Sequence, residues 1–273
     1  MSENMTAPAD INLMAMQLPV QTQPQANAMM GMPAHQQDIP PGLAYLTNVS
    51  EVLVQQQVDL LEVFSGYETN NKYVVKNAAN QQIYFAAEVN LELFLELKEN
   101  DACHRWCCGP IRPFQMKIMD NTGLEVMRLH RPYRCTSCWF PCCLQKIEVF
   151  APPGTLVGYV KQNWSICGPS FSVQNAAEET LYKISGPCCT CGCVCCRDVK
   201  FTLIDKKSGD DIGKIVKQWS GVVQEGYTDA DNFSVQFPQT IEVKMKAVLL
   251  AACFLISNPR NKKKEELRPT EMA

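Results

Sequence analysis

The segment Gly158–Ser165 (GYVKQNWS) returns 55 residues later in the chain as Gly213–Ser220 (GKIVKQWS). Each copy closes a unit that holds a hairpin, a proline, a cysteine cluster ending in Cys-Cys and a second hairpin. The two units cover residues 114–165 and 171–220, and a degenerate earlier copy covers residues 72 to about 132. Self-similarity at this period indicates repeated supersecondary units that bury one shared core.

Short runs rich in Val, Ile, Phe and Tyr alternate with turn residues from residue 61 onward. The expected strands are 72–77, 81–88, 114–119, 124–130, 146–150, 157–163, 171–174, 180–184, 199–204, 212–218 and 233–237. Asn, Asp, Gly and Pro between them supply the backbone angles of tight turns. About ten to twelve antiparallel strands with short connections favour a closed barrel over an open sheet, because closure removes the edges. We therefore predict a mainly β protein.

The segment Ile241–Ile256 (IEVKMKAVLLAACFLI) has no turn residues and predicts a helix that is apolar on all sides from Ala247 onward. Such a helix is buried either in protein or in a membrane. A membrane span needs about 20 apolar residues, whereas only ten here are uncharged and contiguous. Basic residues after the segment favour a cytoplasmic C-terminus. The pattern favours a helix inside the barrel and leaves a membrane span open.

Composition bounds the domain organisation and the class of function. Residues 1–42 are rich in Met, Gln, Pro and Ala and predict a disordered tail, residues 43–257 form the folded domain, and 258–273 form a charged tail. A net charge of −3 gives no support to a nucleic-acid binder. Residues 1–42 show no apolar core behind a basic start, so we expect no secretory signal and reduced thiols. No motif of a hydrolase, a phosphate loop or a zinc protease occurs, so we do not expect an enzyme.

The chain has fifteen cysteines, most of them in three clusters at residues 103–108, 135–143 and 188–196. Packed thiols serve as disulfide partners, metal ligands, redox centres or acylation sites, and a reducing compartment disfavours the first of these. Zinc is an alternative for the third cluster, because Cys188/Cys191 and Cys193/Cys196 have Cys-X2-Cys spacing, although the two pairs crowd each other. His104 among the cysteines of the first cluster is a weaker metal candidate.

In their order and spacing these features resemble the phospholipid scramblase family over Pro41 to about Ile256. The segments that carry the resemblance include Pro40–Leu46, Asn71–Tyr73, Arg131-Pro132, Ala151–Thr155 and Asp229–Phe233. The resemblance implies a tubby-like fold, a closed twelve-stranded antiparallel barrel around a C-terminal hydrophobic helix. It also implies calcium-stimulated, ATP-independent, bidirectional movement of phospholipids between bilayer leaflets. The alternative is a lipid- or protein-binding barrel that acts as a membrane or nuclear signalling adaptor.

The resemblance also implies partners and a location. The expected partners are a phospholipid membrane and signalling proteins, and Lys262–Lys264 are candidates for anionic headgroups. The expected location is the cytoplasmic face of the membrane, most naturally the plasma membrane, with a nuclear pool. Attachment would come from acylation of Cys138, Cys142 and Cys143, which match the family's cysteine motif, since two or more lipids are needed for lasting attachment. Candidates for further acylation, or for zinc, are Cys188, Cys189, Cys191, Cys193, Cys195 and Cys196, with unmodified loop thiols as the remaining alternative.

Two more segments match the family. Residues 229–240 resemble its calcium segment, with candidate ligands at Asp229, Asp231, Phe233, Val235, Phe237 and Thr240. Only two of these are carboxylates, so the expected calcium affinity is weak; an ordinary strand after an acidic turn is the alternative. Residues 213–222 match the family's atypical nuclear-import segment, with Gly213, Lys214, Lys217 and Trp219 as its key residues. Their alternation also predicts an ordinary strand.

Overall fold

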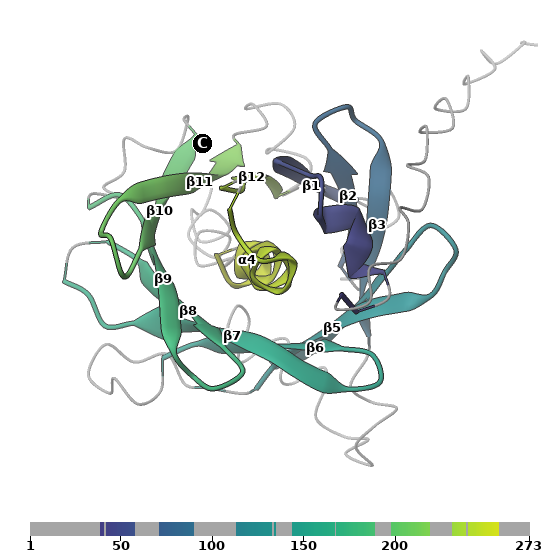
Figure 1. The fold of residues 1–273 in the computed structure, drawn as a ribbon, viewed down its shortest axis with the longest axis horizontal. Coiled ribbons are helices and arrows are strands. Elements are labelled where there is room, and N and C mark those ends of the chain that lie inside the picture. Colours follow the sequence, from purple (N-terminus) through teal and green to yellow (C-terminus); the bar gives the residue numbers. More distant parts are fainter. Residues whose placement is uncertain are drawn as a thin grey trace, which may run out of the picture.

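The computed structural model describes residues 39–40, 42–57, 71–89, 113–132, 134, 144–166, 168–188, 198–218, 231–238 and 240–256. Twelve antiparallel strands form one closed barrel in which each strand pairs with its neighbours in the sequence, and β1 pairs with β12 to close the ring (Figure 1). The strands are β1 Glu51–Gln57, β2 Lys72–Asn77, β3 Gln82–Val89, β4 Phe114–Met119, β5 Glu125–Arg131, β6 Lys146–Ala151, β7 Thr155–Asn163, β8 Ser170–Asn175, β9 Thr180–Ser185, β10 Val199–Asp205, β11 Asp211–Gln218 and β12 Asn232–Gln236. The expected closed twelve-stranded barrel is therefore confirmed.

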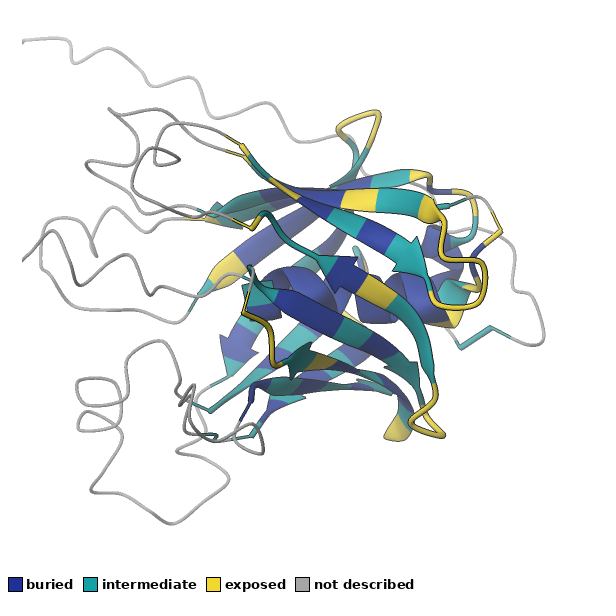
Figure 2. Ribbon diagram, turned by 90° about the vertical axis from the view of Figure 1, so that its left-hand side faces the viewer, coloured by how far each residue is buried: buried dark blue, intermediate teal, exposed yellow. Residues whose placement is uncertain are grey.

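The helix α4 (Val243–Ile256) runs through the inside of the barrel and fills it (Figures 1 and 2). Residues Ala247 to Cys253 are all fully buried, and Phe254 and Leu255 nearly so. A twelve-stranded ring is too wide to be filled by its own inward side chains, so a central element completes the core. The prediction of a helix buried within the barrel is confirmed. Among the described residues, no helix combines the length and the apolar character needed to cross a bilayer.

A short 3-10 helix, η1 (Leu43–Leu46), caps the interior beside α4. Gly42 precedes it at φ 87°, and a Cβ at this position would lie 2.0 Å from Cγ1 of Val126, so both the angle and the space require glycine. The Tyr84 hydroxyl donates to the Gly42 carbonyl at 2.7 Å. These contacts join η1 to β3 and β5 and fix where the chain enters the barrel.

The two ends of the barrel differ in their connections. Tight turns follow β2, β4, β6, β8 and β10, and we call this the turn end. The other connections leave from the opposite end, which we call the connection end. The three cysteine clusters belong to the connections after β3, β5 and β9, so all three are joined to the barrel at the connection end. Of the cysteines, Cys188 and Cys253 lie within the described residues.

Candidate functional site

A chain of polar contacts crosses five strands at the connection end. The Lys217 ammonium lies 2.6 Å from a carboxylate oxygen of Asp231, whose backbone N–H donates to the Gln56 side chain at 2.9 Å. Gln56 donates to Asn71 at 3.0 Å, and Asn71 donates to Glu88 at 2.8 Å. The contacts link β11, β12, β1, β2 and β3 where the barrel closes. Two residues from different predicted segments, Lys217 and Asp231, are thus brought together.

The calcium segment does not fit a single loop around one ion. Asp231 precedes β12 at the connection end, whereas Thr240 follows β12 at the turn end, and a five-residue strand spans about 16 Å. Phe233, Val235 and Phe237 are buried in the core, so their side chains face away from solvent. Asp229 lies outside the described residues. The alternative, an ordinary strand after an acidic turn, describes this segment, and Asp231 is left as its described carboxylate.

The nuclear-import segment forms most of β11, which is hydrogen-bonded to β10 on one side and to β12 on the other. Lys214 is exposed on the outside of the barrel, while Lys217 is about one third exposed and paired with Asp231. Gly213 packs against β12, because a Cβ there would lie 2.6 Å from the Gln236 carbonyl oxygen. Trp219 lies outside the described residues. Of the three described residues, Lys214 is the one that the folded barrel presents to a partner.

The acylation candidates Cys138, Cys142 and Cys143 lie outside the described residues, as do Cys189, Cys191, Cys193, Cys195 and Cys196. Cys188 is exposed at the end of β9 and takes part in a disulfide, which departs from the expectation of reduced thiols. Over the part of the chain that the structure describes, no three His, Cys, Asp or Glu side chains gather as a metal site.

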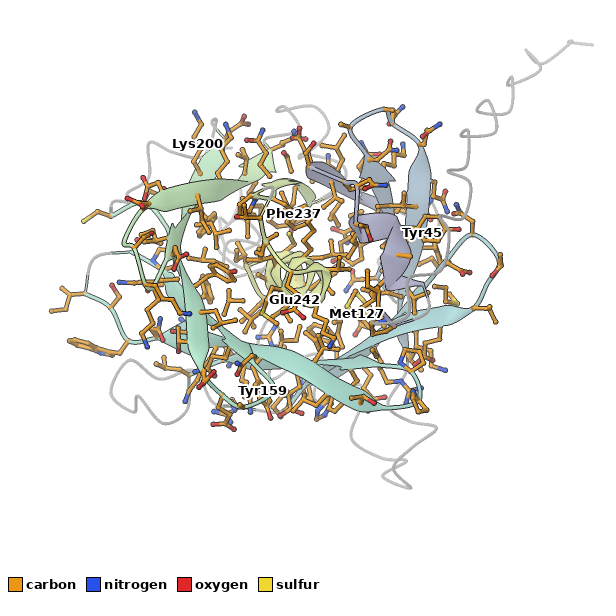
Figure 3. The ribbon with its side chains drawn as sticks, in the orientation of Figure 1. Tyr45, Met127, Tyr159, Lys200, Phe237 and Glu242 are labelled. Atoms are coloured by element: carbon orange, nitrogen blue, oxygen red, sulfur yellow. The ribbon has the colours of Figure 1, made fainter. Side chains whose placement is uncertain are left out.

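The outer wall of β5 to β7 carries a charged cluster that the sequence did not reveal. Nδ1 of His130 lies 3.1 Å from Oε2 of Glu148, and the Lys146 ammonium lies 3.2 Å from Oε1. Lys146 also sits 3.8 Å from the ring centroid of Tyr159, on the outer side of the wall (Figure 3). Desolvation would raise the pKa of Glu148, but the hydrogen bonds from His130 and Lys146 outweigh it and the pKa is lowered. The carboxylate is therefore held in its charged form.

A pocket of about 560 Å³ opens beside this cluster. Its lining is Gln115, Glu125, Arg128, His130, Phe150, Ala151, Pro152, Pro153 and Gly154. Arg128 donates to both carboxylate oxygens of Glu125, at 2.8 and 3.1 Å. A pocket with both signs of charge beside an aromatic ring can accept a small polar group. No sequence signal could have found it, because its residues are spread over three strands and a turn and carry no motif.

The architecture defines a barrel that is filled by α4 and carries the charged cluster of Lys146, Glu148 and His130 on its outer wall. The family model for Scramblase matches residues 29–259, and the chain belongs to the scramblase family. It is 51% identical over 246 residues to phospholipid scramblase 1 of Rattus norvegicus, covering 87% of this chain and 70% of that one. It is 54% identical over 220 residues to phospholipid scramblase 2 of Bos taurus, covering 80% and 70%. Phospholipid scramblase family member 5 of Homo sapiens is 45% identical, covering 80% and 76%.

Among solved structures, a protein from Arabidopsis thaliana matches 76% of this chain and 91% of its own length with a TM-score of 0.38 and 10% sequence identity.

Proposed function

We propose that this chain moves phospholipids in both directions between the leaflets of a bilayer, without ATP and in response to calcium. The observation that carries the proposal is membership of the scramblase family over residues 29–259, with relatives named phospholipid scramblases at about half identity. The fold supports a protein that works on a surface. Its interior is filled by α4, so a lipid has no path along the barrel axis.

We further propose attachment to the cytoplasmic face of the membrane through Cys138, Cys142 and Cys143. The motif lies in the connection between β5 and β6, which is joined to the barrel at the connection end. Burial of α4 supports this route, because its apolar residues already pack against the barrel and the chain needs another source of membrane affinity. Two or more acyl chains together give lasting attachment, whereas one gives only reversible binding. Zinc at the third cluster is the less favoured use of its cysteines.

We propose that calcium binds this chain with weak affinity when it triggers the response. Asp231 can contribute only in competition with Lys217, whose ammonium lies 2.6 Å away. Such competition lowers affinity, in keeping with a site that has few carboxylates. The proposed calcium response depends on carboxylates of this chain and does not require a preformed calcium-binding loop.

A second function, as a membrane or nuclear signalling adaptor, is favoured by the exposure of Lys214 on β11 and by the pocket beside Glu125 and Arg128. An import receptor that reads Gly213–Trp219 as an extended peptide would have to detach β11 from both of its neighbours. We therefore expect the nuclear pool to depend on recognition of the folded surface around Lys214, or on partial unfolding of β11.

The test is reconstitution of the purified chain into liposomes that hold a fluorescent phospholipid in both leaflets, followed by quenching from outside. Scrambling exposes the inner leaflet and takes the quenched fraction above that of protein-free liposomes, and calcium should accelerate the approach to this plateau. A folded protein, judged by its circular dichroism, that leaves the inner leaflet protected with and without calcium would refute lipid movement and favour the adaptor.

A further inference from the structure

Three lysines project outward near the connection end, on three of the four consecutive strands β7 to β10. Lys161 and Lys183 are each third from the end of β7 and β9, and Lys200 is the second residue of β10. Lys161 and Lys183 both register with Ser172 of β8, which places them on one row across three strands. With adjacent strands about 4.8 Å apart, this row holds two like charges about 10 Å from each other. Lys200 lies on the outer side of the next strand (Figure 3).

None of these three lysines forms an ion pair within the part of the chain that the structure describes. All three side chains are exposed. Strands β7, β8 and β9 contain no Asp or Glu, and the carboxylates on or next to β10 are Asp205, at the turn end, and Asp198, which directly precedes the strand. By contrast, Lys146, directly opposite Lys161, is paired with Glu148. Exposed lysines without an ion pair leave this part of the outer wall positive, which suits an anionic partner.

Exposed apolar side chains lie next to the lysines. Trp164 directly follows β7 and is 55% exposed, and Ile166 is 87% exposed. The connection that carries them is tied to the end of β9, because the Gly186 N–H donates to the Pro169 carbonyl at 2.8 Å. Trp164 and Ile166 therefore project from the same rim as Lys161 and Lys183.

We propose that Lys161, Lys183, Lys200, Trp164 and Ile166, the lysine rim, dock this protein on the surface of an anionic phospholipid bilayer. Lysines near a membrane gain attraction to anionic headgroups, while Trp and an aliphatic side chain seat in the interface. Exposed apolar groups beside unpaired lysines favour a lipid surface over nucleic acid or an acidic peptide, which would need a groove. The inference rests on the proposed function in taking a membrane as the partner, and it adds which face of the barrel meets that membrane.

The test is flotation of the full chain, purified from bacteria so that it is not acylated, with phosphatidylcholine vesicles containing or lacking phosphatidylserine. Parent protein should float with the anionic vesicles, and less so as salt is raised. Lys161→Gln/Lys183→Gln/Lys200→Gln should weaken binding about fivefold for each lysine, on the order of 100-fold in all. Trp164→Ser/Ile166→Ser should weaken it by at least about tenfold, because interfacial burial of both side chains is lost.

Matched controls come from the turn end. Lys206→Gln/Lys207→Gln/Lys244→Gln removes the same charge, and Leu124→Ser removes a side chain that is 65% exposed. Both should bind like the parent. The docking surface would be overturned if the control and rim variants lost equal affinity for vesicles, or if both rim variants bound vesicles as the parent does. It would also be overturned if the rim variants lost binding to nucleic acid or heparin but not to vesicles. Lipid scrambling is measured separately. If vesicle binding depends on the lysine rim but no lipid is scrambled, the proposed function alone is refuted. If lipid is scrambled but vesicle binding does not depend on the lysine rim, the docking surface alone is refuted.

Discussion

Lys246, at the start of the buried part of α4, donates a hydrogen bond to the carbonyl of Leu46, 200 residues earlier in the chain, at 2.9 Å. The same ammonium donates to the carbonyls of Thr47 at 3.1 Å and Val49 at 2.9 Å. Lys246 is only 4% exposed, and burial lowers its pKa. A single charged side chain thus satisfies three carbonyls at the end of η1 and ties the first element of the domain to its last.

Substitution of Lys246 by Met should destabilise the barrel by about 2–4 kcal/mol, because three carbonyls lose a charged donor at once. Lys244→Met, two residues earlier on α4 with a side chain that is 45% exposed, is the matched control and should stay within about 0.5 kcal/mol of the parent. Urea unfolding followed by circular dichroism measures both. Equal stability of the two variants would show that the three hydrogen bonds from Lys246 do not stabilise the barrel.

Substitution of Leu250 by Asp should prevent the whole domain from folding. Leu250 is fully buried at the middle of α4, and an unpaired carboxylate there costs more than about 4 kcal/mol. Leu124→Asp, at an exposed turn, should fold normally. The readout is the cooperative thermal transition, and a folded Leu250→Asp barrel would show that α4 is not part of its core.

The sequence predicted most of the barrel because its hairpins are local. Eleven strands lie within two residues of their expected positions, since alternation and turn residues fix a hairpin without reference to the rest of the chain. Strand β1 was missed. Its inward residues Val52 and Val54 alternate as they should, but its partner β12 lies almost the whole domain away and no turn joins them. The pairing that closes the barrel is the one with no local signal.

The candidate site was less predictable for the same reason. For residues 229–240 the sequence left a calcium loop and an ordinary strand both open, and the burial of Phe233 and Val235 shows that a strand separates Asp231 from Thr240. The contact between Lys217 and Asp231 depends on the pairing of β11 with β12. The sequence repeat includes Trp164, but only the folded structure shows that this side chain is exposed at the end of the strand that carries Lys161.

Glu148 should contribute to acid stability. Its pKa lies below the ordinary value of 4.5, so its contribution is present above about pH 4.5 and is lost as the pH falls through the lower, folded-state value. Glu148→Gln should cost up to about 1 kcal/mol at neutral pH and flatten the loss of stability below pH 4.5. Glu242→Gln, with a side chain that is 63% exposed, is the matched control and should stay within about 0.5 kcal/mol of the parent at neutral pH. If the free energy of unfolding of Glu148→Gln falls with pH in parallel with that of the parent, Glu148 does not contribute to acid stability.

Membrane attachment in cells should depend on Cys138, Cys142 and Cys143 together. Their replacement by Ser removes the candidate acylation sites and should release the protein from the membrane fraction, because surface docking alone is reversible. The matched control is Cys253→Ser, at a thiol buried within α4, where no acyl chain can be added. Fractionation of expressing cells gives the result. Retention of the triple variant at the level of the parent would mean that attachment does not need these cysteines.

Calcium binding should become tighter when Lys217 is replaced by Met. The Lys217 ammonium lies 2.6 Å from the Asp231 carboxylate and both neutralises it and repels a cation. Its removal should raise the affinity about tenfold from a starting Kd on the order of 10⁻⁴ to 10⁻³ M, since one partly screened charge near a surface is worth about 1 kcal/mol or more. Asp229→Ala/Asp231→Ala should abolish the heat of calcium binding in calorimetry.

The matched control is Lys214→Met, at a residue that is exposed on the same strand and away from Asp231, and it should bind calcium like the parent. If Lys217→Met binds calcium no better than Lys214→Met does, Asp231 is not a ligand, and any calcium response of this chain arises elsewhere.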